Sequence, residues 1–230
     1  MKKTRRIPAL LLAMLMLFSL TLTGCGQKEE IADPDKVAVA IFDIVLKDDP
    51  SAIVELFGYT DEAEARKDMG IEGSVYDDLA EQMVEMFAGM GVTATTEDAQ
   101  TFVDAFLTMF KNVTLTAKTK SADEKAGTAV VTCTISTFDP NSINDAMGQI
   151  VQDIAADEEL LAGDEAALYS AMLNKMSEAI AELKPTDNTK DFDVDFVLEK
   201  HNINGKVRQV WMPKDVNGFG NAIGSNAMGT

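Results

Sequence analysis

The stretch VTLTAKT, residues 113–119, alternates apolar and polar side chains and marks the point where the chain changes character. Alternation with a period of two is typical of a strand that has one buried and one solvated face. A charged turn follows at residues 121–127, and residues 128–138 read as a returning strand with Val131, Cys133 and Ile135 on one face. We therefore predict a β-hairpin at the centre of the chain.

Upstream of this hairpin, apolar residues recur at helical spacing. Asp33-Pro34 is a helix-start signal, because aspartate caps a helix well and proline fits its first position. Further helix starts are predicted at Pro50, Thr60, Ser74 and Thr95 or Thr96. The first half of the domain is thus predicted to be helical.

Downstream, Asp139-Pro140 repeats the helix-start signal. We predict a helix pair from Asn141 to Leu183, with an acidic break at residues 157–163 before a second helix capped by Asp164. Residues 192–198 and 207–212 form a second hairpin around Asn204-Gly205, because both turn residues tolerate positive φ. Residues 214–230, rich in glycine and asparagine, are expected to be a flexible tail.

These elements predict an α+β fold. N-terminal helices pack on a curved antiparallel sheet of two hairpins, and the helix pair is inserted between the hairpins. We expect a single domain over residues 33–213, preceded by a short tether, residues 25–32.

Residues 1–24 have the layout of a secretory signal peptide: basic residues, then an apolar run too short for a spanning helix of about 20 residues. Leu22-Thr23-Gly24-Cys25 resembles the lipobox of bacterial lipoproteins. The resemblance implies cleavage before Cys25 and a diacylglycerol on its thiol, which would hold the protein at the outer face of the cell membrane. The alternative is an ordinary signal peptide with an incidental cysteine.

The composition excludes one class of partner. The chain has 20 basic and 38 acidic residues, and without residues 1–24 it has 16 and 38, a net charge of −22. Such a surface repels nucleic acid and anionic lipid headgroups, so we expect no nucleic-acid binding. Cys133 is the lone thiol besides Cys25, so an internal disulfide is not expected.

Few residues suggest catalysis. His201 is the one histidine, which argues against a histidine-based zinc site. Cys133 lies mid-strand and reads as a buried structural thiol. Asp191, Asp193 and Asp195 share a strand face, but a calcium loop also needs a turn glycine and a bidentate glutamate. We interpret them as solvated charges at a strand edge, and we expect no enzyme, no metal site and no cofactor.

Trp211 is the most prominent candidate for ligand binding. Together with Phe196 and Phe106 it is predicted to line a cavity between sheet and helices. The alternative is that Trp211 simply fills the core.

The final hairpin NGKVRQVW, residues 204–211, and the helix 34–46 followed by Lys47-Asp48-Asp49 resemble small lipoproteins of Gram-positive bacteria. Their domains, of unknown function, are similar to the nuclear transport factor 2-like and cystatin-like folds. The resemblance implies a conical cavity that relatives use for small ligands, catalysis or dimer contacts. The helix pair from Asn141 to Leu183 departs from the plain fold and would cover or fill this cavity.

Two functions follow as hypotheses. The first is a membrane-anchored extracytoplasmic lipoprotein that binds a small ligand or a peptide without catalysis. The alternative is a structural or protein-interaction lipoprotein of the cell envelope with no ligand cavity. A homodimer is an open alternative under either function, and the membrane is contacted through the lipid on Cys25.

Overall fold

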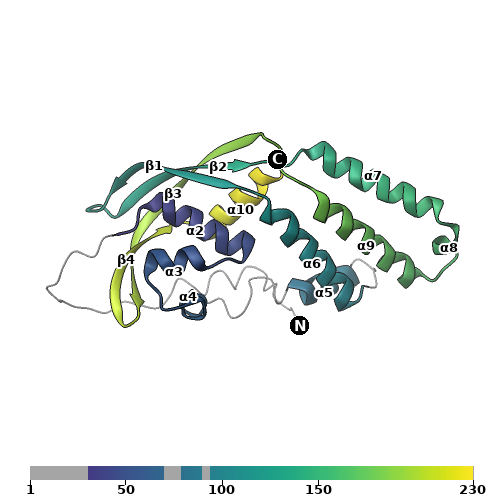
Figure 1. Cartoon of the computed structure of the whole chain (residues 1–230), viewed down its shortest axis with the longest axis horizontal. Coiled ribbons are helices and arrows are strands. Elements are labelled where there is room, and N and C mark those ends of the chain that lie inside the picture. Colours follow the sequence, from purple (N-terminus) through teal and green to yellow (C-terminus); the bar gives the residue numbers. More distant parts are fainter. Residues whose placement is uncertain (1–30, 70–78, 90–93, 230) are drawn as a thin grey trace, which may run out of the picture. The chain divides into compact units, whose positions relative to one another are not determined.

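The computed structural model describes residues 31–69, 79–89 and 94–229 (Figure 1). Its four strands form one antiparallel sheet in the order β1-β2-β3-β4. This confirms the α+β class, with N-terminal helices, two hairpins and helices between them. The elements are α2 (Pro34–Lys47), α3 (Ser51–Phe57), α4 (Glu62–Asp68), α5 (Leu79–Gly89), α6 (Thr96–Lys111), β1 (Leu115–Asp123), β2 (Thr128–Ser136), α7 (Pro140–Ala156), α8 (Glu158–Leu161), α9 (Glu165–Glu182), β3 (Thr189–Ile203), β4 (Lys206–Pro213) and α10 (Val216–Ala227).

The described residues divide into two compact units. Unit 1 contains residues up to 73, 116–134 and 191–223, which hold α2, α3, α4 and most of the sheet. Unit 2 contains residues 74–115, 135–190 and 224–230, which hold α5 to α9. The single domain predicted over residues 33–213 stays a prediction.

Three of the predicted helix starts, Thr95, Asp139 and Asp164, are confirmed by capping contacts. Asp139 accepts a hydrogen bond from the Asn141 amide, and Asp164 accepts one from Ala167. The prediction for Thr60 is wrong, because Asp61 caps α4 by accepting from the Glu64 amide. The predicted cap Ser74, the signal peptide and Cys25 lie outside the described residues.

The core of unit 1 forms where α2 packs against α3 and β4. Of the apolar residues at helical spacing in α2, Val37, Ile41 and Ile44 are buried and Val45 is half-buried. The second hairpin turns at Asn204 and Gly205, whose φ angles are 55° and 73°. This confirms the predicted turn, since both angles lie in the left-handed region.

The flexible tail predicted for residues 214–230 is wrong for residues 216–227, which form α10. Phe219, Ile223 and Ala227 are buried. They recur every four residues and so share one helix face. Burial of this face outweighs the poor helix propensity of the three glycines in α10. Asp215 accepts a hydrogen bond from the Gly218 amide at 2.8 Å at the start of the helix.

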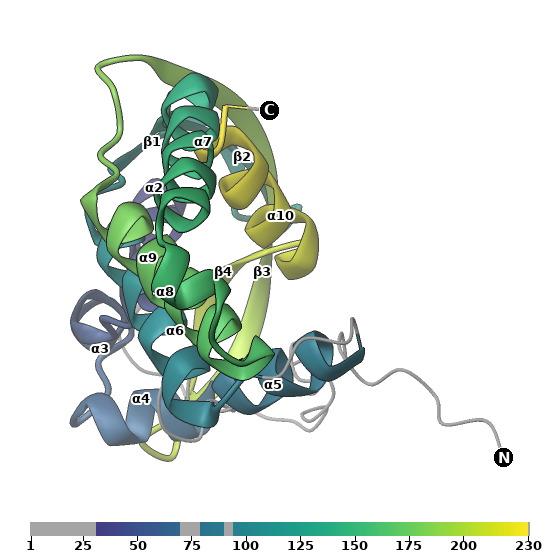
Figure 2. The same cartoon turned by 90° about the vertical axis from the view of Figure 1, so that its right-hand side faces the viewer.

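Unit 2 is a helical assembly in which α6 packs against α5 and α9, and α7 packs against α9. Figures 1 and 2 show α7 and α9 side by side, with the short α8 between them in the chain. The predicted helix pair is confirmed, although the expected acidic break contains α8, which is capped by Asp157. Within the part of the chain that the structure describes, none of the helices has the length and apolar character needed to cross a bilayer.

Candidate functional site

The three residues predicted to line a ligand cavity belong to two units, Trp211 and Phe196 to unit 1 and Phe106 to unit 2. Trp211 pairs with Leu198 across β4 and β3, and the exposed fractions of Trp211 and Phe196 are 2% and 1%. The rings of Phe196 and Phe219 lie 6.4 Å apart. Phe106 is half-buried in unit 2, with its ring 5.0 Å from that of Phe102. Trp211 and Phe196 are thus core residues of unit 1, and their role in ligand binding stays a prediction.

Cys133 is fully buried on β2, on the same face as Val131 and Ile135. Burial, with a smaller contribution from the charge of Asp193, raises the pKa of its thiol to about 12. A thiol with so high a pKa is a poor nucleophile, because the thiolate is the reactive form. The structure therefore agrees with the interpretation of Cys133 as a packing residue.

The strand aspartates are bonded to neighbouring strands. Thr134 Oγ1 donates to Asp191 at 2.6 Å, and Thr132 Oγ1 donates to Asp193 at 2.7 Å. Lys120 Nζ lies 2.7 Å from Asp193 and is the main cause of the lowered pKa of that carboxyl. The prediction of edge charges is wrong, because β3 lies inside the sheet. Among residues 31–69, 79–89 and 94–229, no group of histidine, cysteine and acidic residues is suited to a metal ion.

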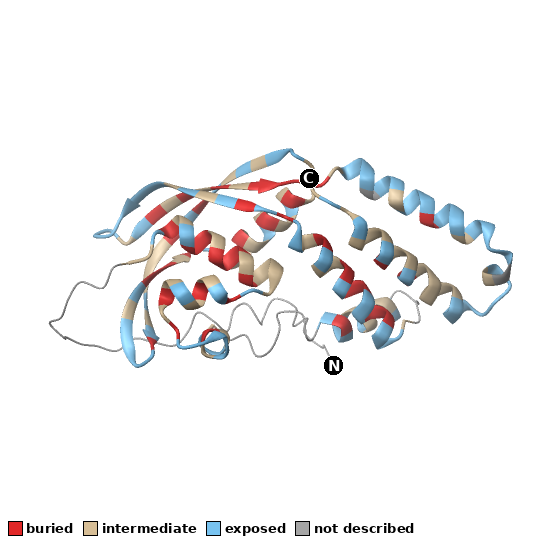
Figure 3. Cartoon of the chain, viewed as in Figure 1, coloured by how far each residue is buried: buried red, intermediate tan, exposed pale blue. Residues whose placement is uncertain are grey.

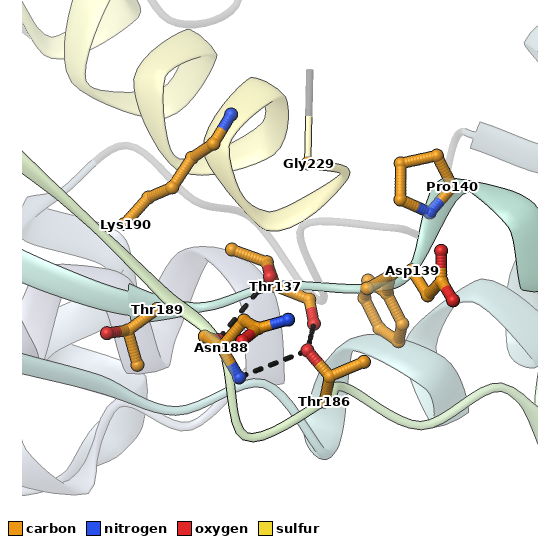
Figure 4. Close-up of a pocket in the computed structure, with 9 residues that line it drawn as sticks. Thr137, Asp139, Pro140, Thr186, Asn188, Thr189, Lys190 and Gly229 are labelled. Atoms are coloured by element: carbon orange, nitrogen blue, oxygen red, sulfur yellow. Dashed lines mark hydrogen bonds between the residues drawn. The ribbon is translucent and has the colours of Figure 1, made fainter.

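A polar pocket of about 370 Å³ lies in unit 2, where the end of β2, the start of α7 and the α9–β3 connection meet (Figure 4). Thr137 Oγ1 donates to the Asn188 carbonyl, and Thr186 Oγ1 donates to the Thr137 carbonyl. These side chains are thus bonded to the pocket wall. The lining residues are Thr137, Phe138, Asp139, Pro140, Thr186, Asn188, Thr189, Lys190 and Gly229.

Sequence reasoning did not find this pocket. Its lining comes from three segments that are far apart in the chain, and each segment alone reads as an ordinary connection. The one sequence signal among the residues that line this pocket is the helix start at Asp139-Pro140, and it indicates a helix rather than a cavity.

A second, open hollow of about 620 Å³ lies where α7 meets α8, also in unit 2. It is lined by Asp153, Ala156, Asp157 and Glu158. Large apolar side chains are exposed on the same two helices: the exposed fractions of Met147, Val151 and Leu161 are 38%, 64% and 52%. The sequence predicted only an acidic break at this place.

Unit 2 carries most of the net negative charge of the chain without residues 1–24. It holds 18 acidic residues and four lysines, whereas unit 1 without residues 1–24 holds 20 acidic and 12 basic residues. The segment 140–182, which contains α7, α8 and α9, has nine acidic residues and Lys175 as its one basic residue. Such a surface attracts cationic partners and repels anionic ones.

One buried carboxylate joins α6 to α9. Asp98 is 7% exposed and forms a capping box with Thr95. Ser170 Oγ from α9 donates to its other oxygen at 2.8 Å. Burial favours the neutral form of this carboxyl, but the hydrogen bonds from Thr95, Ser170 and Asn174 outweigh burial and lower its pKa. Asp98 thus serves packing in unit 2.

Comparisons with known proteins found a family profile and a solved structure that match this chain. A family profile described as "Domain of unknown function (DUF5105)" matches residues 27–208. A crystal structure described as a "putative lipoprotein (ycdA)" from Bacillus subtilis matches with a TM-score of 0.50 and 19% identity over 84% of this chain. This chain spans 57% of that structure, and the likeness shows the fold. The search of curated proteins returned no significant match.

Proposed function

We propose that this chain is a lipoprotein held by Cys25 at the outer face of the cell membrane. The chain belongs to the family described as "Domain of unknown function (DUF5105)". We further propose that its domain is a non-catalytic module that binds a protein partner in the cell envelope.

Two observations support the anchor. Leu22-Thr23-Gly24-Cys25 has the lipobox pattern at the end of a signal peptide, and the Bacillus subtilis protein of similar fold is itself described as a "putative lipoprotein". The tether of residues 25–32 reaches at most about 28 Å when fully extended. Cys25 would thus keep the domain close to the membrane surface.

The burial of Trp211 and Phe196 in the core of unit 1 is the observation that carries the interaction function. Trp211 and Phe196 are almost completely buried. Neither of the two hollows described above is lined by either residue. Large apolar side chains are instead exposed on α7 and α8 of unit 2. Exposed apolar side chains rimmed by charge are typical of protein-binding surfaces, so the structure supports a protein partner over a small ligand at Trp211.

The anchor is tested by Cys25→Ser in the native host, with Cys133→Ser as the control. We expect Cys25→Ser to abolish labelling by a radioactive fatty acid and to release the protein from the membrane fraction. Cys133→Ser should leave both unchanged, because Cys133 is buried. Labelling that persists in Cys25→Ser would contradict the anchor.

The binding function is tested by photo-crosslinking on intact cells. A photoreactive amino acid is placed singly at exposed positions of both units, including Glu55, Val151, Leu161 and Val207. We expect at least one position to give a discrete crosslinked protein product. The binding function would be contradicted if all positions on both units stayed uncrosslinked while the protein remained at the membrane.

The polar pocket supports a second candidate function, the binding of a small polar ligand. Its volume of about 370 Å³ lies in the range of natural ligand pockets. A nuclear magnetic resonance screen with small polar fragments tests this function. Fragments that bind there should bind more weakly in Thr189→Trp, whose larger side chain narrows the pocket, and should be retained in the exposed control Thr108→Trp.

A further inference from the structure

We infer that Asn204 is a site of covalent modification, at which the side-chain amide is converted to a carboxylate without an enzyme. The conversion detaches the turn between β3 and β4 from the α3–α4 connection, residues 58–61. Both steps take place within unit 1, and neither depends on which partner or ligand the domain binds.

The chemistry requires only the pair Asn204-Gly205 and water. The backbone nitrogen of Gly205 attacks Cγ of Asn204, so that an N–Cγ bond forms while the Cγ–Nδ2 bond breaks. Nδ2 takes up the proton of the Gly205 amide and leaves as ammonia, and a succinimide ring remains. Water then opens the ring at either carbonyl and leaves an aspartate or an isoaspartate. Glycine favours the attack, because it has no side chain to hinder the approach of its nitrogen.

A second asparagine–glycine pair in the chain shows what the fold contributes. Asn217-Gly218 lies in the first turn of α10, where the Gly218 amide donates to Asp215 Oδ1 at 2.8 Å. The attacking nitrogen is thus engaged, and α10 is held in place by the buried face that contains Phe219. The helix would have to unwind before the ring could close. The fold therefore protects Asn217.

The pair Asn204-Gly205 occupies a more permissive place. Both residues are exposed, and Figure 3 shows the tip of this hairpin as exposed. Their φ angles of 55° and 73° belong to a two-residue turn between β3 and β4. A turn at an exposed tip rearranges with the loss of few contacts. Of the two asparagines, Asn204 is thus the one that reacts in the folded protein.

The side chain of Asn204 also joins two elements of unit 1. Its Nδ2 donates to the Gly58 carbonyl at 2.8 Å, and its Oδ1 accepts from Thr60 Oγ1 at 3.3 Å. An asparagine amide supplies a donor and an acceptor, whereas a carboxylate only accepts. Conversion to aspartate therefore removes the donor and places a negative oxygen beside the Gly58 carbonyl, which repels it. Isoaspartate in addition lengthens the backbone of the two-residue turn.

The conversion loosens the α3–α4 connection rather than unfolding unit 1. The turn lies beside α3 and α4 (Figures 1 and 2). Arg208 of β4 donates to the Phe57 carbonyl, and this bond does not involve Asn204. The expected result is local opening of residues 58–61 while β3 and β4 stay paired.

The first test measures conversion in the purified protein, as isolated from its native host. The protein is incubated at mildly alkaline pH and digested with trypsin, and the peptide of residues 201–206 is analysed by mass spectrometry. This peptide contains Asn202 as an internal control, because the branched side chain of Ile203 hinders attack there. We expect Asn204 to convert and Asn202 to stay unchanged. The rate should fall in mild acid, since the attacking amide must lose its proton.

Unfolding in guanidinium chloride is the control for the fold. Both asparagine–glycine pairs lose their structure there, so Asn204 and Asn217 should convert at similar rates. In the folded protein Asn204 should convert several-fold faster than Asn217. The inference is overturned if the two asparagines convert at the same rate in the folded protein, or if Asn204 stays unchanged while both convert in guanidinium chloride.

The second test measures the detachment with Asn204→Asp. Asn202→Asp is the matched control, because it adds the same charge to an exposed residue of the same hairpin. We expect Asn204→Asp to speed hydrogen exchange of the Tyr59 and Thr60 amides about tenfold, and Asn202→Asp to leave that exchange unchanged. Equal exchange in the two variants would overturn the detachment.

Discussion

Helices α2 and α7 begin with the same sequence signal, yet they occupy opposite environments. Each starts at an Asp-Pro pair, Asp33-Pro34 and Asp139-Pro140, and each has an apolar stripe at helical spacing. Seven residues of α2 are buried, whereas Ile150 is the one buried residue among the described side chains of α7. The difference arises because α2 packs between α3 and β4, while α7 contacts α9 and α8.

The net charge also differs between the unit that contains α2 and the unit that contains α7. Unit 1 without residues 1–24 has a net charge of −8, and unit 2 has a net charge of −14 with four lysines. Unit 1 thus combines a sheet core with mixed surface charge. Unit 2 combines packed helices, chiefly α6 against α9, with an acidic surface. The comparison teaches that the same helix-start signal precedes a buried helix in one unit and an exposed helix in the other.

The largest expected effect tests burial directly. Ile44→Ala in α2 should lower the free energy of unfolding of unit 1 by about 3 kcal/mol, because Ile44 is fully buried. Val151→Ala in α7 should change the stability by less than about 0.5 kcal/mol, because Val151 is exposed. Urea denaturation followed by Trp211 fluorescence reports unit 1, since Trp211 is the one tryptophan, and far-ultraviolet circular dichroism, which follows the helices, reports unit 2. Equal effects of the two substitutions would remove the contrast between the helices.

A glycine pair gives the next largest effect. Gly58 has φ of 72° and ends α3, and a Cβ there would collide with Arg208 Nη1. That nitrogen donates to the Phe57 carbonyl at 2.5 Å. Gly58→Ala should therefore destabilise unit 1 by about 2 kcal/mol through strain and the disturbed hydrogen bond.

Gly148 on α7 is the matched control, because a Cβ there meets no atom within 4 Å. Gly148→Ala should stabilise α7 by about 0.5–1 kcal/mol, since alanine is the better helix former. Circular dichroism during thermal unfolding measures both variants. A destabilising Gly148→Ala would show that α7 packs more closely than its exposure indicates.

The third prediction concerns the buried carboxylate of unit 2. Asp98→Ala should destabilise the α6–α9 contact by about 1–2 kcal/mol, because Ser170 Oγ, Thr95 Oγ1 and the Thr95 amide lose their acceptor. The folded pKa of Asp98 is lowered, so its contribution is present above the unfolded pKa of about 3.9 and is lost as pH falls through the folded value. Hydrogen exchange of α6 and α9 amides at pH 7 and at pH 3 measures the effect.

Asp98→Asn is the control for the charge. It keeps the size of the side chain, removes the titration, and should flatten the pH dependence of α6 and α9 protection. An unchanged pH dependence in Asp98→Asn would assign the acid sensitivity to other carboxylates.

The smallest effect compares the two caps. Asp139 accepts a hydrogen bond from the Asn141 amide, whereas Asp33 makes no side-chain cap bond to α2. Asp139→Ala should cost about 1 kcal/mol in local stability of the first turn of α7. Asp33→Ala should cost only a few tenths of a kcal/mol, through the helix dipole. Hydrogen exchange of amides in the first turns resolves the difference, and equal losses would contradict it.

Much of the fold could be predicted because its signals are local. Caps at Thr95, Asp139 and Asp164, and the turn at Asn204-Gly205, depend on residues within four positions of each other. The burial of Cys133 followed from the two-residue period of its strand. Helix α10 was missed because its three glycines argue against a helix, and its buried face is stabilised by distant residues such as Phe196.

The candidate site could be predicted less well than the fold. Trp211 and Phe196 were expected to line a cavity, but aromatic side chains on a strand look the same in sequence whether they face a cavity or fill a core. Asp157 and Glu158, which line the open hollow at the α7–α8 junction, fall in the predicted acidic break at residues 157–163, yet nothing local distinguishes a binding surface from a solvated connection.

The sequence by itself determined the export signal, the lipobox pattern, the net charge and the order of helices and hairpins. These depend on composition and on short-range backbone and side-chain interactions. Tertiary structure alone decided that α2 is buried and α7 exposed, that residues 216–227 form a helix, and that Asp153, Asp157 and Glu158 line one hollow. Burial depends on which surfaces meet, and segments distant in the chain supply those surfaces.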